Sequence, residues 1–263
     1  MTTNDELKQV YDAQYAAGYA AAHTPVDTWE ESLLIHRLGG DWRGRTVLEI
    51  GCGEGRLAAL LAMSGADVIA YDYSAEAIRR ARWTYKRVGQ VYFQCGDPVG
   101  VKGLNRLGRG CDVVVMQGVL EHLDDWKDYL SRIIMKRGSK AIIITSSPSF
   151  LNPRGYIWQA LRLLLGVPMS LTDLHFICPP DMEQFAAEHD YKLTYESCHH
   201  DWAAGDTLLR DYAQRLPNAL RDAGLPTDRV PELLAWLEQV KGFYEPQAWS
   251  GANVVYKLEK DNG

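Results

Sequence analysis

Three closely spaced glycines follow a short apolar segment near the start of the chain, and they constrain the fold more than any other feature. The segment 45–51 reads RTVLEIG, and its final Gly51 is followed by Gly53 and Gly55. Glycine tolerates positive φ angles and lets a ligand approach the backbone closely. In doubly wound sheets such a turn joins a buried strand to a helix, at the carboxyl edge where ligands bind. The segment therefore predicts an α/β fold with a ligand site at this turn.

Apolar segments alternate with amphipathic ones along most of the chain. Strands are expected at 45–51, 66–72, 91–95, 111–117, 140–145, 191–196 and 252–259. Helices are expected at 57–64, from Ser74 through Arg82, at 126–135 and from Pro179 onward. Apolar strands that alternate with helices of about 10 to 15 residues form a parallel sheet covered on both faces. A chain of 263 residues fits one such domain.

Three further segments are expected to be helical and to lie outside this repeating unit. Residues 1–43 are alanine-rich and carry Tyr11, Tyr15 and Tyr19 four residues apart, on one face of a helix. The segments 150–175 and 202–246 are rich in leucine and aromatic residues. We expect these two insertions to form a cap on a single domain that spans residues 1–263.

Composition excludes several classes of protein. A formal charge of −6 gives no overall field that attracts nucleic acid. The five cysteines are scattered without a C-x-x-C pair, which argues against a disulfide framework and a structural zinc site. The first residues include acids and no apolar run, unlike a signal peptide, and no segment has the ~20 apolar residues of a membrane span. We therefore expect a cytoplasmic protein.

The spacing of the glycines separates two kinds of ligand loop. A dinucleotide loop has the pattern G-x-G-x-x-G, but this chain has G-x-G-x-G followed by Arg56. Asp72 ends the second expected strand, about twenty residues after the first glycine, where a carboxylate accepts hydrogen bonds from ribose hydroxyls. The alternative is that Asp72 only caps the following helix. Asp97 is placed to accept from an adenine amino group, and Tyr73 offers an apolar face to the ring.

Residues 47–72, Gly96-Asp97 and 116–123 (MQGVLEHL) together resemble the class I S-adenosylmethionine-dependent methyltransferases. The resemblance covers about residues 45–198 and the last strand. It is closest to the small-molecule group that includes ubiquinone O-methyltransferases and glycan or natural-product methyltransferases. It implies a Rossmann-like seven-stranded sheet in which the reversed last strand, 252–259, inserts beside the fifth.

The resemblance also implies a site for S-adenosylmethionine, with S-adenosylhomocysteine as product. Many relatives have aspartate where this chain has Glu49, and both carboxylates accept hydrogen bonds. The methionine part would lie against the glycine loop and the end of the fourth strand, and the ribose and adenine against the ends of the second and third. The implied residues are Glu49, Gly51, Cys52, Gly53, Gly55, Asp72, Tyr73, Gly96, Asp97, Gln117 and Gly118.

Methyl transfer to a hydroxyl requires alignment of the acceptor and removal of its proton, and histidine suits the second task. His175 is the favoured base, and His122 is the second candidate. His199 and His200, beside Asp201, form a third. Each has a structural alternative: His122 organises its loop, His175 caps a helix, and the pair lies exposed at a strand end. A magnesium site at Glu121 and His122 is disfavoured because oxygen-rich ligand clusters are missing, so no metal is expected.

The expected function is methylation of a small-molecule acceptor, favouring a hydroxyl on a sugar or aromatic ring. N-methylation of a small amine, methylation of a lipid-linked acceptor and an inactive cofactor-binding module are the alternatives. Arg56 argues against a dehydrogenase, and the acidic charge against tRNA or protein as acceptor. The apolar residues of 151–169 must pack against the second insertion, a second copy of the chain, or a membrane. With only Arg154 and Arg162 on this segment, an enclosed pocket is favoured over a membrane surface.

Overall fold

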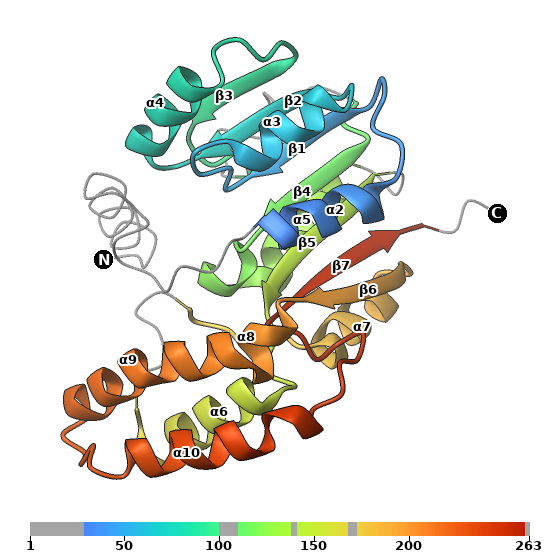
Figure 1. The fold of residues 1–263 in the computed structure, drawn as a ribbon. Helices are drawn as coiled ribbons and strands as arrows, with labels where there is room; N and C mark the ends of the chain where they lie inside the picture. The colour runs from blue at the N-terminus through green and yellow to red at the C-terminus, as the bar shows by residue number, and fades with distance from the viewer. Residues whose placement is uncertain (1–28, 100–109, 138–140, 168–172, 261–263) are drawn as a thin grey trace.

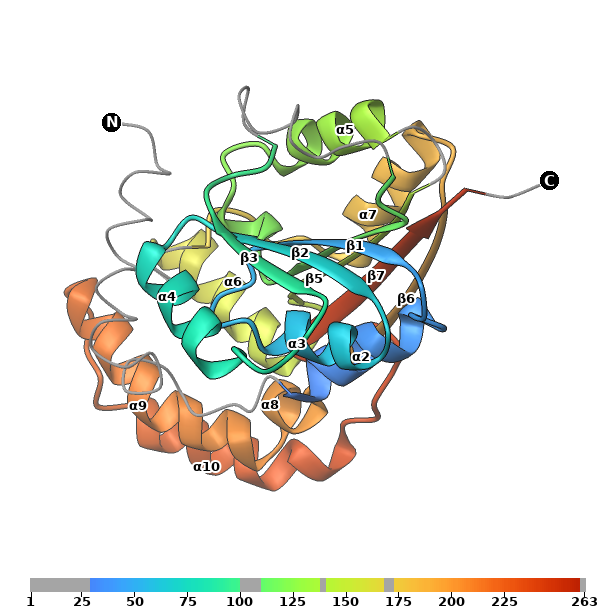
Figure 2. The same cartoon turned by 90° about the horizontal axis from the view of Figure 1, so that it is seen from above.

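The computed structural model describes residues 29–99, 110–137, 141–167 and 173–260, which build a seven-stranded sheet with helices on both faces (Figures 1 and 2). The strand order is β3-β2-β1-β4-β5-β7-β6. Strands β1 to β5 pair in parallel, whereas β7 is antiparallel to both β5 and β6. The strands are β1 (Thr46–Ile50), β2 (Asp67–Asp72), β3 (Val91–Cys95), β4 (Val113–Gln117), β5 (Ile142–Pro148), β6 (Lys192–Cys198) and β7 (Asn253–Glu259). The predicted Rossmann-like sheet with a reversed last strand beside the fifth is confirmed.

Helices cover the two faces of the sheet separately (Figure 2). One face packs against α5 (Trp126–Arg137) and α7 (Pro179–Glu188), and the other against α2 (Trp29–Gly39), α3 (Arg56–Met63) and α4 (Ala75–Thr84). Alternate residues of β1 enter different cores: Leu48 and Ile50 face the α5–α7 side, and Val47 faces the α2–α4 side. This alternation follows from the period of two along a strand.

A third core lies between helices that follow the carboxyl ends of β5 and β6 (Figure 1). The core lies between α6 (Pro153–Leu165), α9 (Asp206–Asp222) and α10 (Val230–Val240), and α8 (His200–Ala204) leads from β6 into α9; we call these four helices the cap. Trp158 of α6 packs edge-to-face on Tyr212 of α9, with ring centroids 5.8 Å apart. The first insertion therefore packs against the second, one of the three partners considered from the sequence.

The structure corrects several predicted boundaries. Helix α2 ends at Gly39, so the predicted helix does not extend over 40–43. There Gly40 has a φ of 77°, and Trp42 folds back to donate its indole N–H to the carbonyl of His36. Strand β5 extends to Pro148, beyond the predicted end at 145. Tyr11, Tyr15 and Tyr19 lie outside the described residues. Within the described ranges, no helix is both long enough and apolar enough to cross a bilayer.

Candidate cofactor and acceptor site

The glycine loop between β1 and α3 is closely packed on its inner side. Gly51, Gly53 and Gly55 have φ angles of 74°, 51° and 83°. A Cβ atom on Gly51 would lie 2.4 Å from a methyl carbon of Val119, and one on Gly55 would lie 2.5 Å from the ring of Phe93. The amides of Gly51 and Cys52 donate to the carbonyl of Tyr71, at 2.8 and 2.9 Å. Both backbone conformation and packing therefore require glycine in this loop.

Asp72, the last residue of β2, connects two loops at the carboxyl edge. Its Oδ2 accepts from the amide of Gly53 and its Oδ1 from the amide of Ser74, both at 2.8 Å. Ser74 itself caps α4, since its hydroxyl accepts from the amide of Ala77. Asp72 thus holds the glycine loop against the start of α4. Each carboxylate oxygen has two acceptor positions, so this role is compatible with binding a ribose.

Glu49 lies behind the glycine loop and is almost fully buried, with 2% of its surface exposed. Burial, followed by the charge of Asp72, raises the pKa of Glu49 to about 8, against a backbone hydrogen bond from Ala58. Its Oε2 has no hydrogen-bond partner. A buried carboxyl with an unpartnered oxygen fits a ligand that carries positive charge, as the sulfonium and ammonium groups of S-adenosylmethionine do.

Two further glycines leave room at the ends of β3 and β4. A Cβ atom on Gly96 would have no atom within 4 Å, and one on Gly118 would meet only Glu121 Oε1, at 3.5 Å. Beside Gly96, Asp97 Oδ1 accepts from the amide of Val99 and from the hydroxyl of Tyr129. With the glycine loop, Asp72 and Glu49, these positions form one continuous edge, and the residues present fit the cofactor.

Helix α2 contributes residues to this edge that the sequence did not indicate. Ser32 donates to Oε1 of Gln117 at 2.9 Å, and Gln117 donates to Glu31 Oε2 at 3.2 Å. Glu31 is buried, and its Oε1 has no partner. Only the contact of α2 with the end of β4 makes Glu31 part of the site. Nothing in the residues 1–43 distinguishes this glutamate from the other acids.

The turn after β4 and the segment before α7 bring two of the candidate histidines together. Leu174 and His175 donate their amides to the carbonyl of Glu121, at 2.7 and 3.1 Å. Nδ1 of His122 lies 3.3 Å from Oδ1 of Asp173, and both side chains are mostly buried. Nε2 of His175 lies 3.2 Å from the carbonyl oxygen of Asp124.

Glu121, next to His122, is a buried acid within this turn. Its Oε2 accepts from the hydroxyl of Ser147 at 3.3 Å. Burial, reinforced by the charge of Asp173, raises the pKa of Glu121 well above its usual value. The turn therefore places a buried acid with a raised pKa beside a histidine–aspartate pair.

His199 and His200 are arranged differently from the prediction. His199 is buried with a φ of 58°, and its Nδ1 lies 3.2 Å from Oε2 of Glu30. Asp201, the carboxylate expected beside both rings, instead accepts from the amides of Asp206 and Thr207 at the start of α9. The carboxylate near His199 is thus Glu30, and Asp201 supplies acceptors for the amides at the start of α9, which have no partner within the helix.

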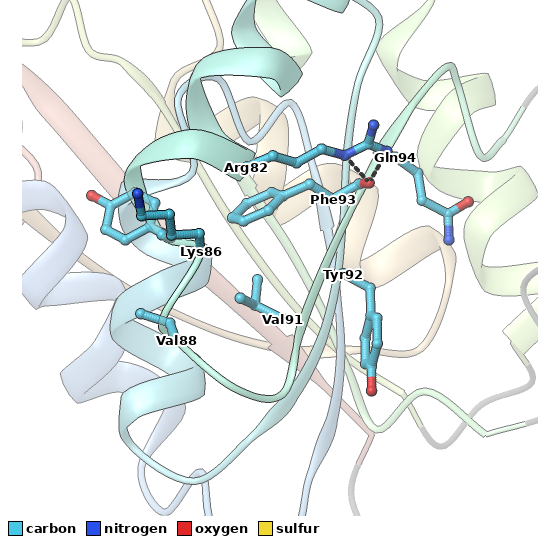
Figure 3. Close-up of a pocket in the computed structure, with 8 residues that line it drawn as sticks. Arg82, Lys86, Val88, Val91, Tyr92, Phe93 and Gln94 are labelled. Carbon is cyan, nitrogen blue, oxygen red and sulfur yellow. Dashed lines mark hydrogen bonds between the residues drawn. The ribbon is translucent and has the colours of Figure 1, made fainter.

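The described residues include no group of three or more His, Cys, Asp or Glu side chains arranged to hold a metal ion. A hollow of about 390 Å³ lies elsewhere, along β3 and α4 (Figure 3). In it Arg82 donates to the carbonyl of Phe93, which is in the middle of β3. The hollow is therefore separate from the carboxyl edge that carries the loop and the histidines.

Comparisons with known proteins identify the family. A family model described as a methyltransferase domain matches residues 30–195. A ubiquinone biosynthesis O-methyltransferase of Bordetella avium is 33% identical over 162 residues, which cover 59% of this chain and 65% of that protein. The chain thus matches slightly less than two thirds of the length of that relative.

Solved structures share the fold at low sequence identity. The structure of DhpI in complex with S-adenosylhomocysteine has a TM-score of 0.58 at 14% identity. The match covers 97% of this chain and 96% of DhpI. Phosphoethanolamine N-methyltransferase 2 of Haemonchus contortus, in complex with S-adenosyl-L-methionine, has a TM-score of 0.61 at 14% identity, covering 99% of this chain and 60% of that one. Because the family model matches residues 30–195, more than half of the chain, and the reversed last strand lies beside the fifth as predicted, the chain belongs to the class I S-adenosylmethionine-dependent methyltransferases.

Proposed function

We propose that this methyltransferase modifies a hydroxyl group of a small-molecule acceptor, a sugar or an aromatic ring, with His122 as general base. The observation that carries the proposal is the His122–Asp173 pair, 3.3 Å apart, in the turn that follows the carboxyl end of β4. The name of the Bordetella avium relative, an O-methyltransferase, supports a hydroxyl as the acceptor group.

The contact with Asp173 suits His122 to remove a proton from the acceptor. Asp173 favours the tautomer of His122 with the proton on Nδ1, which puts the lone pair on Nε2. A carboxylate in this position also stabilises the imidazolium that forms when the ring takes up a proton. When bound, S-adenosylmethionine supplies the activated methyl group, so the protein has to align the acceptor and remove one proton.

The cap is proposed to enclose the acceptor. It is formed by segments that leave the carboxyl ends of β5 and β6, at the same edge of the sheet as this turn. The edge from Glu49 to Asp97 is assigned to the cofactor, so selection of the acceptor is left to the added helices. His175, the base favoured from the sequence, remains the alternative to His122, because it is anchored to the same turn through the carbonyl of Glu121.

Substitution of the histidines tests the proposal. On the acceptor that gives the highest turnover in a screen of sugars and phenols, His122→Asn should lower kcat by about 10²–10⁴-fold. Affinity for S-adenosylhomocysteine should stay unchanged. His36→Asn is the matched control. His36 lies in the last turn of α2, away from Glu31 and Ser32, and its ring hydrogen-bonds to Ser64, which follows α3. Full turnover by His122→Asn together with loss in His175→Asn would transfer the role to His175.

A further inference from the structure

Arg154, in the first turn of α6, is a buried cation with incomplete pairing. Only 4% of its surface is exposed, and α6 begins five residues after β5 ends at the carboxyl edge. Its Nε and Nη1 atoms are buried and have no hydrogen-bond partner. Buried side-chain donors in proteins are nearly always satisfied, so such an exception in a stable core calls for a physical explanation.

The nearest carboxylate, Asp211, does not satisfy Arg154. Arg154 Nε lies 3.9 Å from Asp211 Oδ2, which is too long for a hydrogen bond. That oxygen accepts from the indole N–H of Trp202 at 3.1 Å, and Oδ1 lies 3.2 Å from Nε of Arg215. One buried carboxylate thus faces two guanidinium groups. The cluster of Arg154, Arg215 and Asp211 carries one surplus positive charge.

The surroundings of Arg154 shield its guanidinium group from solvent. Its guanidinium stacks on the ring of Trp202, 4.1 Å from the centroid, which shields one face. Burial lowers the pKa of Arg154, and the charges of Asp211 and Asp173 oppose that shift only in part. Asp173 is also the partner of His122, so Arg154 lies within electrostatic reach of the proposed base.

We propose that Arg154 binds an anionic group of the acceptor, a carboxylate or phosphoryl oxyanion, while the acceptor hydroxyl lies toward His122. This inference rests on the proposed function and narrows the acceptor to small hydroxylated molecules that carry an oxyanion. Guanidinium N–H groups form strong charge-assisted hydrogen bonds with such oxygens. An oxyanion would supply the acceptors that Nε and Nη1 lack and would compensate the surplus charge.

Thermal melting of the full chain, saturated with S-adenosylhomocysteine, tests the binding step without turnover. Inorganic phosphate and benzoate, each compared with chloride at equal ionic strength, should raise the Tm of the parent protein. Arg154→Gln should abolish this rise and should not lower the Tm measured in chloride. Arg162→Gln is the matched control, because Arg162 lies on the same helix but stacks on Phe176, and it should retain the rise.

Paired acceptors test the consequence for the reaction. A hydroxybenzoate is compared with phenol, and a hexose phosphate with the free hexose. In at least one pair the parent should favour the anionic member by about tenfold or more in kcat/KM. Arg154→Gln should remove the preference through KM, and Arg154→Lys, which keeps the charge, should restore part of it. The pair that shows the preference identifies a carboxylate or a phosphoryl group as the anion.

Three results would overturn the inference: equal Tm rises in the parent and Arg154→Gln, no anionic preference in the parent, or a preference that survives Arg154→Gln. If Arg154→Gln melts well below the parent, Arg154→Lys decides. If Arg154→Lys has the Tm of the parent in chloride and its Tm does not rise with phosphate or benzoate, that result also counts against the inference. Failure of the proposed function is distinct, since it would appear as no methyl transfer to any member of either pair while the oxyanion response at Arg154 persists.

Discussion

Asp72 combines two tasks in one carboxylate: it holds the glycine loop through the amide of Gly53 and is assigned to the cofactor ribose. Asp72→Ala should weaken S-adenosylmethionine binding by about 1.5–3 kcal/mol, the range for a hydrogen bond to a charged group. Calorimetric titration measures this loss. Asp67→Ala, at the exposed start of the same strand, should bind like the parent. Equal affinity of Asp72→Ala and the parent would remove Asp72 from the site.

Glu49 should make the stability of the cofactor-free protein depend on pH. Its pKa rises from 4.5 to about 8 on folding, so the folded state holds a proton that the unfolded state has released. The free energy of unfolding should therefore fall as pH rises across this window, by at most about 1.4 kcal/mol per pH unit from this group. In urea unfolding at several pH values, Glu49→Gln should show a shallower decline. Identical slopes for the two proteins would contradict the assignment.

The individual site residues that could be predicted from the sequence are those that lie in local motifs. Asp72 and the loop glycines were found because strand ends and glycine spacing determine their positions. Glu31, Asp173 and Arg154 were not assigned a role in advance. Their roles depend on contacts of α2 with β4, of the segment before α7 with the turn after β4, and of α6 with α9. Such contacts between distant segments have no local sequence pattern.

Among the helices, α6 offers a direct comparison of buried and exposed apolar residues. Trp158 is fully buried against Tyr212, whereas Leu164 is 79% exposed. Trp158→Ala should destabilise the protein by about 3–5 kcal/mol because it opens a cavity in the cap, and Leu164→Ala should change stability by less than about 0.5 kcal/mol. Chemical unfolding measures both. Equal effects would show that the cap core contributes little to stability.

Elements were predicted more reliably than their ends. All seven strands were expected, because continuous apolar runs between helices indicate a buried parallel sheet. The reversed last strand came from the family resemblance, since no local pattern specifies the direction of pairing. The ends of β5 and β6 were predicted too early. Ser146 and Ser147 continue β5 by pairing with Val255 and Val254 of β7, and serine is not a typical strand residue.

For the whole molecule, the sheet and the cap divide the work between them. The sheet edge from β3 to β4 carries residues that fit the cofactor. The cap has its own hydrophobic core and carries Arg154. This division explains why the sequence specified the family closely and the acceptor poorly. The cofactor motifs are local, whereas the proposed acceptor region draws on two insertions that are separated in the chain by α7 and β6.

The central claim is that the edge formed by Glu49, Asp72 and Asp97 binds S-adenosylmethionine, and calorimetric titration with S-adenosylhomocysteine and with NAD tests it most directly. The full chain should bind one equivalent of S-adenosylhomocysteine and show no heat of binding with NAD, because Arg56 stands where a dinucleotide loop has its third glycine. Asp67→Ala should behave like the parent in both titrations. Binding of NAD, or no binding of S-adenosylhomocysteine by the folded protein, would contradict the account.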